Sequence, residues 1–194
     1  ELNQEKADAL IWQYAKYKAI AVAFNPVAIL DILGGVSSDI VMIRALSKLY
    51  GFPMTSFEAS KLWKSIIGSS GTLLISEFGT GLMLGFGKSG AALWSTLESL
   101  SGLTAYAGAM TAQAGAAGYG TYAVGQAAKQ YLQQGCTWGE TGVNHVMQNI
   151  LAQAKADSTL ERLQTEIKAT ISSPEALESL SMKKDTVSKK DTVT

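Results

Sequence analysis

The charged residues of this chain are concentrated in its two outer thirds, and this distribution constrains the fold more than any other feature. Residues 1–64 carry thirteen charged side chains and residues 129–194 carry sixteen, whereas residues 65–128 carry only Glu77, Lys88 and Glu98. The same middle third holds thirteen of the nineteen glycines. A soluble helical domain usually has charge on every surface helix. The middle third therefore predicts segments that face either a tight interior or a lipid bilayer.

The overall composition favours an all-α fold. The chain has 194 residues, of which only three are proline, and alanine, leucine, glutamine and lysine are common. Sixteen basic and sixteen acidic side chains cancel, so no strong overall field attracts nucleic acid. The single cysteine, Cys136, excludes an intramolecular disulfide and a cysteine-based zinc site. We expect a helical domain over residues 1–172, followed by a polar and mostly disordered tail over 173–194.

Helical periodicity and capping signals divide the domain into several helices. Asn25 suits the N-cap of a helix and Pro26 its first turn. Gly51 suits a helix C-cap. Thr55 and Glu58 form a capping box that opens the next helix. The predicted helices cover residues 4–24, 26–49, 56–67, 66–87, 103–133, 143–155 and 159–171.

Two of these segments, 66–87 and 103–128, predict a glycine-rich apolar helical hairpin that lies in or on a membrane. Each reaches the length of about 20 residues that a span needs. Small residues at four-residue spacing would let the two helices approach closely; these are Gly81, Gly85, Gly108, Ala112, Ala116 and Gly120. Against a full crossing, Glu77 would cost about 3 kcal/mol at mid-span. A shallow hairpin and a tight soluble bundle therefore remain as alternatives.

One stretch, GLMLGFGKSG at residues 81–90, has the look of a phosphate-binding loop. The P-loop pattern requires a glycine five residues before Gly87, where this chain has Leu82. The surrounding glycine-rich apolar tract also differs from the strand and helix that flank a P-loop. We expect Lys88 and Ser89 to form a turn, and we expect the chain to bind no nucleotide there.

No set of residues predicts catalysis or metal binding. Asp31 and Asp39 lie about 80° apart around one apolar helix. They fit either a paired acid site or ion ligands, or one buried contact each with Arg44, Lys48 or an N-terminal lysine. His145 is the only histidine, and a nucleophilic Cys136 would need it as a nearby base. We expect no enzyme, no metal and no cofactor in this chain.

Two long stretches resemble a known family. "YAKYKAIAVAFNPVAILDILGGVSSDIVMIRALSKLYGFPMT" is similar to the opening of the YcjF-like helical domain of unknown function. "YGTYAVGQAAKQYLQQGCTWGETG" and "ILAQAKADSTLERLQTEI" are similar to its later part in cyanobacterial members. The resemblance covers roughly residues 10–168. The residues of the family pattern, to which we assign structural roles, are Asn25, Pro26, Asp31, Asp39, Tyr50, Gly51, Trp138 and Gly139.

The resemblance implies a function as well as a fold. Such domains follow Era-like or dynamin-like GTP-binding domains in bacterial proteins, so GTP would be a cofactor only of a GTP-binding domain upstream of Glu1. The expected function is a non-catalytic membrane-associated module that anchors or couples a GTP-binding protein, in cis or in trans, to a membrane. The alternative is a soluble all-helical protein–protein interaction module. The expected partners are membrane lipid and the GTP-binding domain, with homo-oligomers left open. The expected location is the cytoplasmic or stromal side of a bacterial inner membrane or a photosynthetic membrane.

Overall fold

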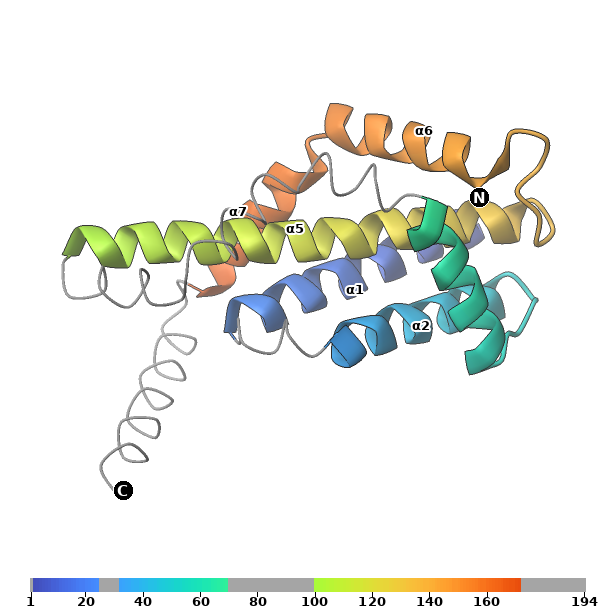
Figure 1. Cartoon of the computed structure of the whole chain (residues 1–194), viewed down its shortest axis with the longest axis horizontal. Helices are drawn as coiled ribbons and strands as arrows, with labels where there is room; N and C mark the ends of the chain where they lie inside the picture. Colours follow the sequence, from blue (N-terminus) through green and yellow to red (C-terminus); the bar gives the residue numbers. More distant parts are fainter. Residues whose placement is uncertain (1, 25–31, 70–99, 172–194) are drawn as a thin grey trace, which may run out of the picture.

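The computed structural model describes residues 2–24, 32–69 and 100–171, and within these ranges it contains helices and connections but no strand. Figure 1 shows α1, α2 and α5 lying side by side, with α6 along the far part of α5 and α7 crossing it. The helices are α1 (Leu2–Phe24), α2 (Ile32–Leu49), an unlabelled helix over 56–69, α5 (Leu100–Gln133), α6 (Gly142–Ala156) and α7 (Thr159–Ile171). The predicted all-α class is confirmed for these residues. The predicted hairpin falls partly on residues 70–87, which lie outside the described residues, as does the tail over 173–194.

The longest helix, α5, is the centre of the bundle, and it packs most extensively against α1. The two helices run antiparallel, because Asp8 meets Lys129 whereas Ala19 meets Gly118. Their backbones approach very closely: a Cβ atom at Gly118 would lie 2.8 Å from the backbone oxygen of Ala15. Glycine is therefore required at this contact by the space available and not by its backbone angles.

The face of α5 that packs on α1 is not the ridge that was predicted to pack against residues 66–87. Gly120, the last member of that ridge, would meet nothing within 4 Å if it carried a Cβ atom. The buried residues of α5 include one row spaced alternately by four and three: Ala114, Gly118, Thr121, Gly125 and Ala128. Four-residue steps advance about 40° around a helix each time, whereas alternating steps of four and three stay on one face. Gly81 and Gly85, the other half of the predicted pair, lie outside the described residues.

Charge is segregated along the length of the bundle. Within the described ranges α1 has no charged residue beyond Lys18, α2 has none before Asp39, and α5 has none before Lys129. Because α1 runs antiparallel to α5, and Asp39 of α2 meets Thr121 of α5, these uncharged stretches gather at the end where α5 begins. We call this the uncharged end; it consists of residues 19–24, 32–38 and 100–118.

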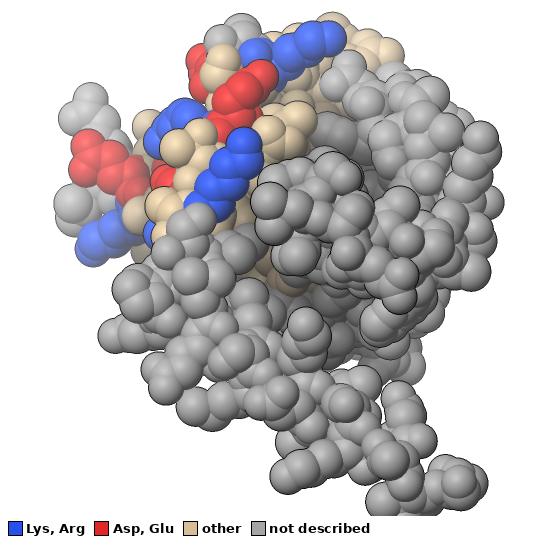
Figure 2. Space-filling view, turned by 90° about the vertical axis from the view of Figure 1, so that its left-hand side faces the viewer, with Lys and Arg blue, Asp and Glu red and all other residues tan. Residues whose placement is uncertain are grey.

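Helix α7, which carries charged side chains, packs on the uncharged stretch of α5 at Gly115 and Gly118. Its Gln164 lies against the backbone of Gly115, and its Glu166 pairs with Lys16 at 3.1 Å. Figure 2 views the molecule from the end where α5 begins, and the charged side chains of the described residues are gathered along one edge of this view. None of the described helices is both long enough and apolar enough to cross a bilayer.

Candidate functional site at the far end of the bundle

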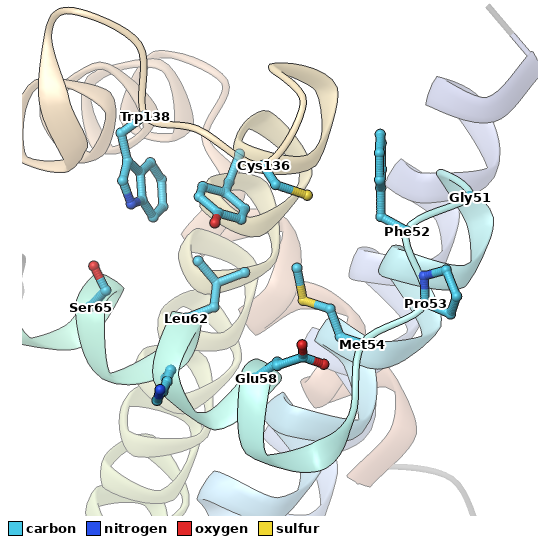
Figure 3. A pocket seen from close by; sticks show the side chains of 11 residues that line it. Gly51, Phe52, Pro53, Met54, Glu58, Leu62, Ser65, Cys136 and Trp138 are labelled. Carbon is cyan, nitrogen blue, oxygen red and sulfur yellow. The ribbon is translucent and has the colours of Figure 1, made fainter.

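A pocket of about 640 Å³ lies at the opposite end from the uncharged end. Figure 3 shows Phe52 and Trp138 standing on opposite sides of it, with the thiol of Cys136 between them and Leu62 and Met54 below. The pocket is lined by Gly51, Phe52, Pro53, Met54, Glu58, Lys61, Leu62, Ser65, Tyr131, Cys136 and Trp138. Its walls are mainly apolar and aromatic, and its size is in the range of about 300–1,000 Å³ that ligand pockets occupy.

Two helix ends of the same construction form opposite walls of the pocket. At the end of α2 the N–H of Gly51 donates to the carbonyl of Lys48 at 3.1 Å, and the N–H of Phe52 donates to that of Ser47 at 2.8 Å. This pair of bonds is a Schellman motif, and Gly51 has the left-handed φ of +79° that the motif demands. The predicted C-cap at Gly51 is confirmed.

The end of α5 repeats this construction. Gly135, with φ of +70°, donates to the carbonyl of Leu132 at 3.1 Å, and Cys136 donates to that of Tyr131 at 3.0 Å. Phe52 and Cys136 therefore occupy the same position in two separate Schellman motifs, and both side chains reach the pocket. The ring of Trp138 packs on Tyr131 with the centroids 4.8 Å apart, which fixes the second wall.

The floor of the pocket is the helix over residues 56–69, and its first turn is the predicted capping box. The carboxylate of Glu58 accepts from the backbone N–H of Thr55 at 2.8 Å and from its hydroxyl at 2.9 Å. In return, the hydroxyl oxygen of Thr55 accepts from the N–H of Glu58 at 3.3 Å. These bonds lower the pKa of Glu58, the backbone bond being the largest cause. The predicted capping box is confirmed.

Two phenols and one carboxyl group around the pocket, those of Tyr50, Tyr131 and Glu58, each have a single protonation state at neutral pH. Burial raises the pKa of Tyr131, and it also raises that of Tyr50, whose hydroxyl accepts a hydrogen bond from the Gln133 amide at 3.2 Å. Both phenols are therefore neutral donors, and Glu58 is a carboxylate. The pocket thus offers apolar contact and hydrogen bonding at neutral pH, with its positive charge supplied at the rim by Lys61.

Asp39, a candidate from the sequence, lies away from this pocket in the middle of the bundle, where it is 4% exposed. Its carboxylate pairs with the Lys18 ammonium at 2.9 Å and accepts from the Thr121 hydroxyl at 2.8 Å and the Trp63 indole at 3.2 Å. Four elements, α1, α2, α5 and the 56–69 helix, therefore meet at one carboxylate. This is the expected buried contact with an N-terminal lysine; Asp31 lies outside the described residues.

The remaining candidates from the sequence are distributed as follows. Gly51 and Trp138 line the pocket, with Tyr50 and Gly139 beside them in the chain. Asn25 and Pro26 lie outside the described residues. His145 is exposed on α6 and does not line the pocket that holds Cys136. Among the described residues no three acidic, histidine or cysteine side chains are grouped as metal ligands would be.

The sequence did not identify several residues that form the walls and floor of the pocket. Phe52, Met54, Leu62 and Tyr131 line it, and none of them was singled out. One signal could have found Phe52: the residue after a C-cap glycine commonly makes an apolar contact with the preceding helix. Phe52 instead remains 45% exposed, and this exposure separates it from an ordinary cap residue.

Fold and site together define a class: an all-α module whose pocket is built from two helix ends and a capped helix. The chain belongs to the domain-of-unknown-function family DUF697, whose model matches residues 1–156. This confirms the resemblance to the YcjF-like helical domain. Neither the curated proteins nor the solved structures include a chain that matches this one.

Proposed function

We propose that this chain is a non-catalytic helical module that couples a GTP-binding protein to a membrane, with its uncharged end toward the lipid. The observation that carries the proposal is the segregation of charge along the bundle, which leaves residues 19–24, 32–38 and 100–118 without a charged side chain. A charged side chain costs about 2.5–3.5 kcal/mol at the centre of a bilayer, so the stretches without a charged side chain are the part of the described bundle suited to lipid contact.

Two further features of the chain support this orientation. Residues 70–99 connect the 56–69 helix to the first turn of α5 and carry only Glu77, Lys88 and Glu98 in their thirty positions. The pocket lies at the opposite end of α5, where a partner protein can reach it while the uncharged end is engaged. The GTP-binding partner and the cytoplasmic or stromal face of a bacterial or photosynthetic membrane follow from the resemblance to the YcjF-like domain.

Flotation of the full chain with phosphatidylcholine vesicles tests the membrane part of the proposal. Ala21 and Gln13 are both exposed on α1, but only Ala21 lies in the uncharged end. We expect the unmodified chain and Gln13→Glu to float with the vesicles, and Ala21→Glu to float several-fold less. Each substitution adds one negative charge to the same helix, so a difference in flotation between the two variants shows that the location of the charge along α1 matters. Failure of the unmodified chain to float would show that the membrane assignment is wrong.

The second candidate is an all-helical protein–protein interaction module without membrane contact. It is favoured by the small residues of α5 that face α1, since Gly118 and Gly125 pack against α1 inside the bundle. The two candidates differ in the flotation experiment, because only the membrane-coupling module floats. Both assign the pocket end to a protein partner.

A further inference from the structure

The pocket is open to a partner, and its exposed apolar rings lie beside a surplus of positive charge. Phe52 lines the pocket and is 45% exposed, and Phe57, on the helix that forms the floor, is 67% exposed. The Lys61 ammonium lies 4.5 Å from the centre of the Phe57 ring, a cation–π contact on the outer face of the 56–69 helix. Lys64 is exposed one turn further on the same helix.

The acidic groups at this end do not balance these lysines. Glu58 is the only acid of the 56–69 helix, and its carboxylate is held by the N–H and hydroxyl of Thr55. The loop on the opposite wall contributes one exposed acid, Glu140, whereas α2 ends with a further exposed cation, Lys48. The start of α1 lies at the same end, and its Asp8 is paired with Lys129 at 2.6 Å. Lys48, Lys61 and Lys64 then outnumber Glu58 and Glu140, and this net positive charge favours a negatively charged occupant.

We propose that the pocket binds an acidic amphipathic segment of a partner protein, a proposal that rests on the assignment of this end to a protein partner. A large apolar side chain of the segment enters between Phe52 and Trp138, above Leu62. Carboxylates of the segment meet Lys61 and Lys64 on the outer face of the 56–69 helix. Buried aromatic anchors surrounded by a charged rim are the usual anatomy of a protein–protein hot spot.

The walls of the pocket are rigid before the partner arrives, and this favours binding. Phe52 follows one Schellman glycine and Cys136 follows another, while Trp138 is packed on Tyr131. Little backbone freedom is therefore lost when the segment enters, so more of the contact energy appears as affinity. The basic end of the chain's own tail would be a poor occupant, because residues 182–194 carry four lysines against two aspartates.

The single thiol of the chain supplies a direct readout of occupancy. Cys136 lines the pocket, so a bound segment should slow its reaction with the disulfide reagent DTNB. The probe is a short synthetic helical peptide with glutamates on its polar face and leucines around one phenylalanine on its apolar face. The matched control is the same peptide with lysines in place of the glutamates. We expect the acidic peptide to slow the reaction of the full chain several-fold, saturably, and the basic peptide to leave it unchanged.

Charge reversal tests the assigned lysines. Lys61 and Lys64 are exposed, so Lys61→Glu combined with Lys64→Glu should leave the fold intact. We expect this double variant to lose protection by the acidic peptide and to gain it with the basic peptide. Lys168→Glu on α7, also exposed, serves as the control and should behave as the unmodified chain. A double variant that still favours the acidic peptide would overturn the role of these lysines.

The same readout distinguishes the other outcomes. Equal protection by both peptides, or by neither, would overturn the proposal of an acidic partner segment. Protection by phosphatidylglycerol vesicles that depends on Lys61 and Lys64 would assign this surface to lipid and also overturn it. Flotation with phosphatidylcholine vesicles is measured on the same double variant. Normal flotation without peptide binding would refute only this inference, whereas peptide binding without flotation would refute only the membrane part of the proposed function.

Discussion

Helix α5 meets its neighbours in two different ways along its length. In its middle, glycine and alanine bring the backbones of α5 and α1 so close that a Cβ atom at Gly118 would lie 2.8 Å from the Ala15 oxygen. At its C-terminal end, Tyr131, Cys136 and Trp138 stand away from the 56–69 helix and leave a pocket of about 640 Å³. Small residues allow close helix packing in the middle of the bundle, whereas large side chains at the helix ends line an open pocket.

The two regions also use carboxylates differently. In the closed middle, Asp39 is buried and bonded to side chains from three other elements. At the pocket, Glu58 is exposed and serves one turn of its own helix. A buried carboxylate must have all of its partners, whereas an exposed one exchanges its partner for water at little cost. The middle of the bundle should therefore be the stable region and the pocket end the adjustable one.

The largest expected effect is the removal of the buried carboxylate. Asp39→Ala leaves the Lys18 ammonium, 19% exposed, without its carboxylate, together with the Thr121 hydroxyl and the Trp63 indole. Breaking a buried pair from one side costs about 3–5 kcal/mol, so we expect the urea midpoint to fall sharply. The control is Lys16→Ala, whose ion pair with Glu166 is about two-fifths exposed on both sides. That change should cost less than about 1 kcal/mol. Equal losses in the two variants would contradict a special role for the Asp39 cluster.

A smaller effect separates two glycines of the same helix. Gly118→Ala places a methyl group against the backbone of α1, which cannot move alone, so we expect a loss of about 1–3 kcal/mol. Gly120→Ala meets nothing within 4 Å and should stabilise the helix by about 0.5–1 kcal/mol. Urea unfolding of both variants measures the two free energies. If Gly120→Ala were the more damaging change, Gly118 would not be the closest approach of α5 to its neighbours and the packing of α5 on α1 described above would be wrong.

This pair of glycines also shows how far the sequence could predict the fold. Signals carried by neighbouring residues were sufficient for local structure: Gly51 ends α2, and Thr55 with Glu58 opens the next helix. The face of α5 was not predictable in this way, because small residues are so frequent in it that several stripes satisfy the spacing rule. The choice between them depends on the register against α1, which is set by distant contacts such as that of Ile11 with Gly125.

The candidate site was predictable only in its parts. Gly51 and Trp138 stood out through the family resemblance, but they are far apart in the chain, and only the packing of α2, the 56–69 helix and α5 brings them to one pocket. For Asp39 a buried contact with a basic side chain was one of the alternatives, yet its bonds to Thr121 and Trp63 join segments that no local pattern connects. Long-range pairing of this kind depends on how the helices cross, and side-chain spacing within one helix does not encode it.

The smallest expected effect is a pH dependence confined to the pocket end. The pKa of Glu58 is lowered from its ordinary value of 4.5, first by the Thr55 backbone bond and then by the Thr55 hydroxyl. A carboxyl group whose pKa is lower in the folded state stabilises that state fully above its unfolded pKa, and the contribution is lost as the pH falls through the folded pKa. The difference in urea midpoint between the unmodified chain and Glu58→Gln should therefore be constant above about pH 5 and should shrink below pH 4.5.

The control for this prediction removes one of the two donors. Thr55→Val deletes the hydroxyl but keeps the backbone N–H, which is the larger cause of the lowered pKa. In an NMR titration of the Glu58 carboxyl group we therefore expect Thr55→Val to raise the pKa only part of the way toward 4.5. A complete return would mean that the hydroxyl, and not the backbone, holds the carboxylate. A Glu58 pKa above 4.5 in the unmodified chain would show that the capping box is not formed in solution, and the floor of the pocket would then lack its first turn.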